Sequence, residues 1–187
     1  MFASSREGEE SGFFGVLRAN PGLVQRVQWL VVPRHPQRFD EVASLAAQHG
    51  LTVSRRSRWT AAPRPAEVWI GDSLGEMAMY YGTADVALLG GSFAPLGGQN
   101  LIEAAACGCP VMMGPHTFNF AEAAQLARQA GAALRVETME EAMRSAASLA
   151  SDPVRRDVAV RAATAFAAAH QGAAEKTANA VLALIEK

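Results

Sequence analysis

A glycine-rich stretch at positions 90–120, "GGSFAPLGGQNLIEAAACGCPVMMGPHTFNF", is the most prominent candidate for chemistry in this sequence. Its second glycine pair, Gly97 and Gly98, permits positive φ angles and a close approach of the backbone to a ligand. Asn100 and Glu103 follow with the spacing of a helix-capping pair, and the first N–H groups of a helix bind anions readily. The pattern predicts a capped helix start that holds a phosphate near Gly98, with Glu103 on the hydroxyls of a ribose.

A second candidate is Arg34, in the stretch "PRHPQR" (33–38) that directly follows the most apolar run of the chain. A guanidinium in this place can bind a phosphate through two parallel hydrogen bonds. His35 either adds a donor or is simply held in place by Pro36. The alternative is a solvated loop in which Arg34 has no ligand.

The stretch "GDSLGEM" (71–77) also joins an apolar run to a helical one. Leu74, Gly75 and Glu76 would present backbone amides and one carboxylate at this junction. Asp72 is suited to cap the following helix, which is the structural alternative for this motif.

Three further residues have weaker patterns. Glu9, in "SSREGEE" (4–10), lies where acidic side chains complement the positive end of a helix, so capping explains it as well as ligand binding does. Ser92 follows the first glycine pair of the long stretch. His116 would face the ligand cleft at the ends of the predicted strands, although a lone histidine is more often structural.

Short runs rich in Val and Ile alternate with segments of helical periodicity along the chain. The predicted strands are 2–5, 27–33, 51–57, 67–72, 84–91, 109–115 and 132–136. The predicted helices are 9–20, 36–50, 74–84, 100–108, 120–131, 138–150, 151–170 and 173–187. This alternation predicts a Rossmann-like, doubly wound parallel α/β sheet with C-terminal helices.

The whole chain, 1–187, is expected to form one domain, because its length suits a single core and it contains no repeat or linker. Thr138 with Glu141, and Asp152 with Pro153, mark the starts of two of the last helices. A strand within the first five residues suggests a fragment cut at a domain border, with a further segment upstream.

The composition narrows the possible functions. Hydrophobic residues make up 50% and charged residues 19%, and the net charge is −1, so nothing favours nucleic acid as a partner. No apolar run approaches the roughly 20 residues that span a bilayer. Cys107 and Cys109 are one residue apart, which fits neither a zinc nor a redox motif, and they are predicted to be small buried thiols. We therefore expect a soluble chain with no metal and no cofactor.

These motifs each follow a predicted strand, and ligands of open parallel sheets bind beyond the carboxyl ends of the strands. Together they predict a nucleotide site on one rim, without a P-loop. In this order, they strongly resemble the carboxyl-terminal half of the bacterial 3-deoxy-D-manno-octulosonic acid (Kdo) transferases of lipopolysaccharide assembly. The resemblance covers at least 1–136, and its specific part is the combination of "GGS", a G-G-x-N-x-x-E helix start and "GPH…NF".

The resemblance implies a GT-B glycosyltransferase with two Rossmann-like halves, of which this chain is the donor-binding one. It implies the donor CMP-Kdo, a lipid A precursor as acceptor, and metal-independent transfer at the cytoplasmic face of the inner membrane. The general base, the acceptor domain and the membrane anchor would lie in an amino-terminal half, without which this chain would be inactive. By position, the residues that contact CMP would be Pro33, Arg34, Leu74, Gly75, Glu76, Gly97, Gly98, Gln99, Asn100, Leu101, Ile102 and Glu103.

Two positions depart from the family pattern. Gln99 stands where the family usually has His, and Ser5 with Arg6 stands where it usually has a Thr-His pair. Gln99 can donate a hydrogen bond but cannot carry a proton, so an acid role is not expected at this position. Arg34 and the helix start are instead expected to stabilise the charge that grows on the CMP phosphate as Kdo departs.

Two other classes of protein remain as alternatives. Other GT-B enzymes, such as UDP-sugar transferases and nucleotide-sugar 2-epimerases, also hold a nucleotide at a glycine-rich helix start. A non-enzymatic doubly wound module, such as a receiver domain, would need Asp residues at the tips of its first strands. The stretch "SSREGEE" has Glu residues within a helix start instead.

Overall fold

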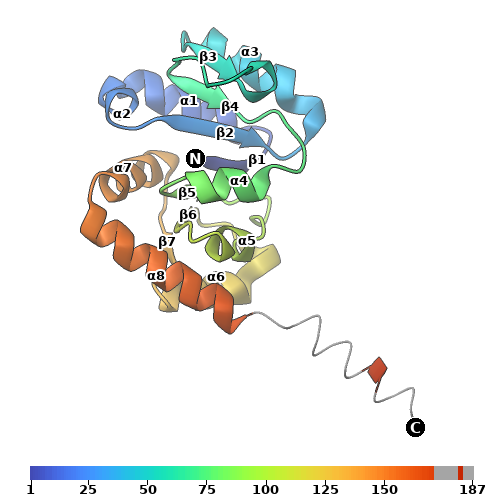
Figure 1. Cartoon of the computed structure of the whole chain (residues 1–187), viewed down its shortest axis with the longest axis vertical. Helices are drawn as coiled ribbons and strands as arrows, with labels where there is room; N and C mark the ends of the chain where they lie inside the picture. Colours follow the sequence, from blue (N-terminus) through green and yellow to red (C-terminus); the bar gives the residue numbers. More distant parts are fainter. Residues whose placement is uncertain (171–180, 183–187) are drawn as a thin grey trace.

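The computed structural model describes residues 1–170 and 181–182, and the strands in this part of the chain form one parallel sheet. The strands are β1 (Phe2–Ser5), β2 (Trp29–Pro33), β3 (Val53–Arg55), β4 (Val68–Ile70), β5 (Ala87–Leu89), β6 (Val111–Met113) and β7 (Ala133–Arg135). Each lies within a predicted strand. In the sheet they are ordered β3-β4-β2-β1-β5-β6-β7 (Figure 1). The predicted Rossmann-like, doubly wound fold is confirmed.

Helices connect most of the strands. They are α1 (Glu9–Ala19), α2 (Pro21–Arg26), α3 (Phe39–Gln48), α4 (Met77–Thr83), α5 (Ile102–Ala106), α6 (Ala121–Gln129), α7 (Met139–Ala150) and α8 (Pro153–Ala169). The sequence predicts all of them except α2, whose six residues are too few to show a helical period. The helix predicted over 173–187 falls almost entirely outside the described residues.

The two predicted caps of the last helices are confirmed. The hydroxyl of Thr138 accepts a hydrogen bond from the Glu141 N–H at 3.1 Å, at the start of α7. The carboxylate of Asp152 accepts one from the Arg155 N–H at 3.0 Å, at the start of α8. Each cap satisfies an N–H group that has no partner within its own helix.

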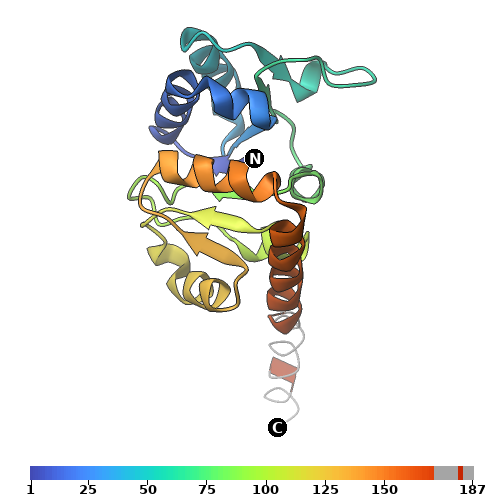
Figure 2. The ribbon, with the colours of Figure 1, turned by 90° about the vertical axis from the view of Figure 1, so that its left-hand side faces the viewer.

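Helices cover both faces of the sheet, so there are two apolar cores. Phe13 of α1 and Met143 of α7 are buried in the first core, and Tyr81 of α4 and Phe166 of α8 are buried in the second. Figure 2 shows α1 and α4 on opposite sides of the sheet. Full burial of each such side chain contributes about 2 kcal/mol to stability. None of the described helices is both long and apolar enough to cross a membrane.

The strand order reverses at β1, which lies between β2 and β5. The chain first moves from β1 to β2 and the far edge, and later returns past β1 to begin β5. The ends of β1 and β5 approach so closely that a Cβ atom placed on Gly90 would lie 2.1 Å from the carbonyl oxygen of Ser4. Ser4 itself has a φ of +52°, at an irregularity in the pairing of β1 with β2. This crossing is the place where ligands bind in open α/β sheets.

Candidate functional site

The predicted contact residues lie at or beyond the carboxyl ends of the strands, and Pro33 is itself the last residue of β2. Arg34 follows β2, Glu76 lies beyond β4, and the glycine-rich loop 90–98 lies beyond β5. His116 lies beyond β6. Strands β4, β2, β1, β5 and β6 are consecutive neighbours in the sheet, so these loops form one continuous rim.

The second glycine pair has the backbone conformation predicted from the sequence. Gly97 has a φ of +87° and Gly98 a φ of +76°, values that L side chains rarely adopt. The side chain of Asn119 donates a hydrogen bond to the Leu96 carbonyl at 3.1 Å, and its backbone N–H donates one to the Gly97 carbonyl at 3.1 Å. A Cβ atom on Gly97 would lie 2.2 Å from the Asn119 amide nitrogen. Asn119 therefore holds the glycine loop, a role that the sequence analysis missed although "NF" was part of the motif.

The helix start after the glycine loop is capped on one side. The side chain of Asn100 accepts a hydrogen bond from the Ile102 N–H at 3.0 Å. The return bond expected from Glu103 is not formed, because α5 begins at Ile102 and Glu103 lies only one residue further on. Glu103 is exposed. Burial, followed by the negative charge of Glu103, raises the pKa values of Tyr81 and Cys107, so this carboxylate lies near both.

The backbone N–H groups of this loop differ in whether they have partners. The N–H of Gly98 donates to the Gly91 carbonyl at 2.8 Å. Those of Gln99 and Asn100 form no hydrogen bond within residues 1–170. The half-buried Gln99 directs its side-chain amide toward Gly91, since a Cβ atom on Gly91 would lie 3.4 Å from that nitrogen. The N–H groups of Gly97 and Leu101 also lack a partner within residues 1–170, but both of these residues are buried, so the donors most open to an anion are those of Gln99 and Asn100.

Arg34 presents an exposed guanidinium at the rim. Its backbone N–H donates to the Ser5 carbonyl at 3.0 Å, which fixes the start of its loop against the end of β1. Within the part of the chain that the structure describes, the guanidinium forms no hydrogen bond or ion pair with another residue. Arg38, four residues on, is by contrast paired with both Glu10 and Glu41. Of these two arginines, Arg34 is therefore the one whose side chain can bind an anion from solution.

The carboxylate of Glu76 is oriented by three neighbours. It accepts hydrogen bonds from the Arg56 guanidinium at 2.8 Å, from the Tyr80 hydroxyl at 3.2 Å and from the Ser73 hydroxyl. The Ser73 hydroxyl, more than Tyr80 and Arg56, lowers the pKa of Glu76 below its ordinary value. Glu76 is therefore ionised and fixed in direction at neutral pH.

Leu74 and Gly75 form a turn beside Glu76. Gly75 has a φ of +77°, and Leu74 is 74% exposed. An apolar side chain exposed on a rim is a suitable surface for the face of a planar ring. The turn thus offers apolar contact next to a fixed negative charge.

Asp72 does not cap α4, so that expectation is wrong. Helix α4 begins at Met77, and the carboxylate of Asp72 turns toward the carboxyl end of β3 and the residues that follow it. There it accepts hydrogen bonds from the Arg55 guanidinium at 2.7 Å and from the N–H and hydroxyl of Ser57 at 2.7 and 2.6 Å. Burial alone would raise the pKa of Asp72, but Ser57 and Arg55 together lower it below its ordinary value.

Replacing Asp72 with asparagine is therefore expected to lower the free energy of unfolding at pH 7 by about 2 kcal/mol. A carboxylate with a lowered pKa contributes stability above its ordinary pKa, and this contribution is lost as the pH falls through the lowered value. The difference between wild type and Asp72→Asn should therefore shrink in acid. Urea unfolding at several pH values measures it, with the exposed Asp157→Asn as control. A constant difference at all pH values would contradict the prediction.

Ser92 is used within the chain. Its fully buried hydroxyl donates to the Leu89 carbonyl and accepts from the Gly114 N–H at 2.8 Å. The hydroxyl thereby joins the loop after β5 to the loop after β6. The hydroxyl already donates one hydrogen bond and accepts another within the protein, and it is buried, so the role of Ser92 is to stabilise these two loops.

Glu9 is also used within the chain. Its carboxylate accepts backbone hydrogen bonds from Arg6 at 2.9 Å, Gly91 at 2.8 Å, Phe93 at 3.0 Å and Ala94 at 3.3 Å. Burial raises the pKa of Glu9, and the four N–H groups oppose this rise. The carboxylate thus occupies the positive end of α1 and also reaches across the crossing point to the loop after β5.

His116 is half-buried beside an open hollow. Its backbone N–H donates to the Ser92 carbonyl at 3.0 Å. The hollow has a volume of about 600 Å³, and Phe118, Arg128 and Arg135 are among its other lining residues. Phe118 is 63% exposed, so an aromatic and a histidine side chain both face solvent at this end of the rim.

The cysteines have the environment of packing residues. Cys109 is fully buried, and burial raises the pKa of its thiol to about 12. Cys107 is half-buried. Within residues 1–170 and 181–182, no three His, Cys, Asp or Glu residues lie together in the manner of metal ligands.

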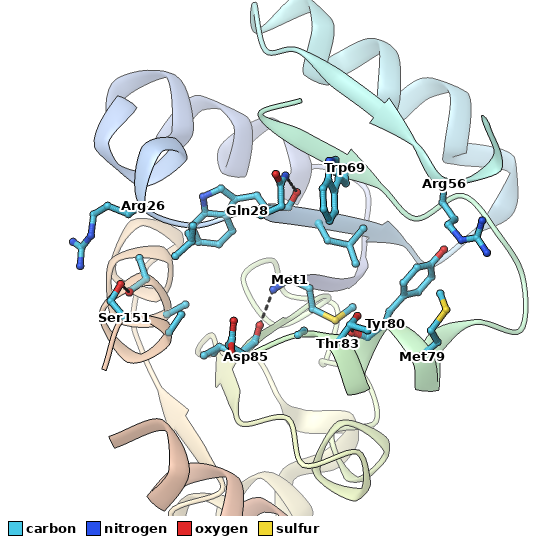
Figure 3. A pocket seen from close by; sticks show the side chains of 18 of the residues that line it. Met1, Arg26, Gln28, Arg56, Trp69, Met79, Tyr80, Thr83, Asp85 and Ser151 are labelled. Atoms are coloured by element: carbon cyan, nitrogen blue, oxygen red, sulfur yellow. Dashed lines mark hydrogen bonds between the residues drawn. The ribbon is translucent and has the colours of Figure 1, made fainter. Parts of the chain in front are cut away.

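Another cavity, of about 630 Å³ and largely apolar, lies away from the predicted residues (Figure 3). It lies between β2, α4 and α7, and Trp69, Tyr80 and Ala147 are among its lining residues. The amino group of Met1 lies in it and donates to the Val86 carbonyl at 2.6 Å. None of the predicted contact residues lines this cavity.

The sequence matches no protein-family model. It is 50% identical over 183 residues to the 3-deoxy-D-manno-octulosonic acid transferase of Bordetella pertussis. This match covers 96% of this chain and 43% of that protein. It is 35% identical over 144 residues to the transferase of the same name from Haemophilus influenzae, covering 77% of this chain and 34% of that protein. The chain thus spans less than half the length of these curated relatives.

A solved structure agrees with these relatives. The chain superposes on the C-terminal CMP-Kdo binding domain of WaaA from Acinetobacter baumannii with a TM-score of 0.79. The match has 27% sequence identity and covers 87% of this chain and 85% of that domain. The sequence relatives and the fold agree on one assignment. The chain belongs to the 3-deoxy-D-manno-octulosonic acid transferase family, and its fold is that of the C-terminal domain of the Acinetobacter baumannii protein.

Proposed function

We propose that this chain binds CMP-Kdo, as the donor-binding domain of a glycosyltransferase that moves Kdo to a lipid A precursor. The observation that carries the proposal is the rim itself. The residues that resemble the CMP-contacting segments of the family follow β2, β4 and β5 along one edge of the sheet. The names of the relatives and of the solved domain support the same function.

In this proposal, the phosphate of CMP lies between the two halves of the rim. The exposed guanidinium of Arg34 binds it from the β2 side, and the N–H groups of Gln99 and Asn100 bind it from the β5 side. As the bond between Kdo and the phosphate breaks, negative charge grows on the phosphate. Fixed donors around that charge each lower the barrier by about 3 kcal/mol.

The nucleoside extends from the phosphate along the same rim, on the side where α4 and α5 contact each other. The exposed carboxylate of Glu103 accepts hydrogen bonds from the ribose hydroxyls, one turn beyond the phosphate. The cytosine ring lies against the exposed Leu74, and Glu76 faces its polar edge with a carboxylate already fixed by Arg56 and Ser73. No metal ion or cofactor takes part in this scheme.

The rest of the enzyme would lie outside this domain. A general base that activates the acceptor hydroxyl, the acceptor pocket and a membrane anchor belong, in this proposal, to an amino-terminal half of the complete protein. Transfer would take place at the cytoplasmic face of the inner membrane. The present chain alone would bind the donor but not transfer Kdo.

Calorimetry with CMP, UMP and UDP tests the proposal on this chain. CMP should bind, and more tightly than UMP or UDP, because the carboxylate of Glu76 can accept a hydrogen bond from the 4-amino group of cytosine, where uracil has a carbonyl oxygen. Tighter binding of UDP would favour a UDP-sugar transferase or 2-epimerase instead. Failure of all three to bind would contradict the proposal and favour a non-enzymatic doubly wound module.

A further inference from the structure

Two adjacent acidic residues at the start of α1 are buried, although neither lies among the proposed CMP contacts. Glu9 is 4% exposed, and Glu10 is not exposed at all. We propose that they are positioning residues, with Glu9 holding the glycine-rich loop and Glu10 holding the loop of Arg34, so that both halves of the donor site keep a fixed separation. This inference rests on the proposed function, because it concerns the same site.

Glu9 reaches toward β5. Of its four backbone donors, one belongs to its own loop, and the other three are the N–H groups of Gly91, Phe93 and Ala94. These three residues begin the loop whose far end carries the glycine pair. The Gly91 carbonyl in turn accepts the hydrogen bond from Gly98. Glu9 is therefore linked to the phosphate-binding end of the loop through one further residue.

Glu10 reaches toward β2. Its two carboxylate oxygens accept hydrogen bonds from the guanidinium of Arg38 at 2.8 and 3.3 Å, and one of them also accepts from the Ser5 hydroxyl at 2.9 Å. Arg38 closes the loop 34–38, and Ser5 accepts the backbone hydrogen bond of Arg34 through its carbonyl. Both ends of the Arg34 loop are thus tied to Glu10.

The position of α1 explains why two neighbouring residues can serve opposite loops. The helix follows β1, which lies between β2 and β5. Successive residues of an α-helix point about 100° apart around its axis. At the first turn, Glu9 therefore faces the β5 side while Glu10 faces the β2 side, and one rigid element spans both halves of the site.

Carboxylates suit this task better than amides. Glu9 faces four N–H donors, and only an ionised carboxylate has enough acceptor sites for all of them. Glu10 binds a forked guanidinium through both oxygens, which also fixes orientation. A glutamine in either place would bring an NH₂ group against donors. The neutral substitution should therefore loosen one loop and leave the other in place.

Loosening a loop should weaken ligand binding, because a ligand must then order that loop as it binds. The loss of binding on replacing Glu10 should depend on the presence of Arg34, because Glu10 holds the Arg34 loop. The loss of binding on replacing Glu9 should be the same with and without Arg34, because Glu9 acts through the glycine-rich loop. Substitutions that act through the same group are not additive, whereas independent ones are.

Calorimetry with CMP on this chain tests the inference. We expect Glu10→Gln to weaken CMP binding about fivefold in the wild-type background and to cause no further loss in an Arg34→Ala background. We expect Glu9→Gln to weaken binding about tenfold in both backgrounds. Amide hydrogen exchange should rise at 34–38 in the first variant and at 91–94 in the second.

Two matched controls carry the same loss of charge without these contacts. Glu41→Gln removes the exposed partner of Arg38 and leaves its pairing with Glu10. Glu7→Gln changes an exposed residue in the short loop between β1 and α1, just before Glu9 and Glu10. Both should leave the dissociation constant of CMP within twofold of wild type. Thermal unfolding identifies variants that do not fold. In that case Glu9→Asp replaces Glu9→Gln, and Ser5→Ala, which removes one hydrogen bond to Glu10, replaces Glu10→Gln. Each should depend on Arg34 in the same way as the variant that it replaces.

The possible results separate this inference from the proposed function. If Arg34→Ala weakens CMP binding but Glu9→Gln and Glu10→Gln do not, the positioning roles are wrong and the donor site stands. An equal loss for Glu10→Gln with and without Arg34 would also overturn its role, because the effect would then be general destabilisation. Failure of the wild-type chain to bind CMP overturns the proposed function and this inference with it.

Discussion

Replacing Arg34 with alanine in a complete transferase that contains this domain is expected to lower the turnover of Kdo transfer about 100-fold. The guanidinium is exposed, has no partner among the described residues and lies at the carboxyl end of β2, on the rim that the proposed donor occupies. Its loss removes a fixed positive charge from a phosphate that becomes more negative as the reaction proceeds. Initial rates at saturating CMP-Kdo and acceptor measure the change.

One control for this prediction keeps the positive charge at position 34, and the other removes an arginine elsewhere. Arg34→Lys retains the charge but not the two parallel hydrogen bonds, so its turnover should lie between wild type and Arg34→Ala. Arg58→Ala removes an exposed arginine that is not among the proposed contacts, and it should have little effect. Near-normal transfer by Arg34→Ala would remove Arg34 from the donor site.

The second large effect is expected on stability. Replacing Gly90 with alanine should lower the free energy of unfolding by about 3 kcal/mol. The new Cβ would lie 2.1 Å from the Ser4 carbonyl oxygen, 2.5 Å from its carbon and 2.7 Å from the Ala3 carbonyl oxygen. All three atoms belong to the backbone of β1, so the clash can be relieved only by separating β1 from β5. Urea unfolding measures the loss.

Gly12→Ala is the matched control for Gly90→Ala. Gly12 lies within α1, and a Cβ atom placed on it would meet no atom within 4 Å. The same chemical change there should raise the free energy of unfolding by about 0.5 to 1 kcal/mol, because alanine favours a helix over glycine. Equal stability of Gly90→Ala and wild type would mean that β1 and β5 separate at little cost.

The order of the elements could be predicted from the sequence because it depends on local patterns. Apolar runs mark each strand, helical periodicity marks each long helix, and residues such as Thr138 and Asp152 mark helix starts through bonds only three residues long. Helix α2 escaped prediction because it is short. The ends of α5 differed from the prediction by two residues at each end, since its position depends on the glycine loop before it.

The acidic residues show where prediction from the sequence stops. Asp72 has the right type and place for a helix cap, yet its carboxylate binds Arg55 at the end of β3 and Ser57 just after that strand. Glu9 looks like a cap or a ligand contact, and only the fold shows that it reaches residues more than 80 positions away. Asn119 likewise acts on a loop 22 or 23 residues before it.

The sequence by itself determined which loops carry glycines, arginine and carboxylates, that each follows a strand, and which family they resemble. Conformational freedom, such as the positive φ of Gly97 and Gly98, is a property of the residue and can be read locally. The tertiary structure alone decided which polar groups remain open to a ligand. Hydrogen bonds between distant segments consume the carboxylates of Glu9 and Asp72 and leave the guanidinium of Arg34 exposed. Those partners are chosen by the strand order, which no local pattern specifies.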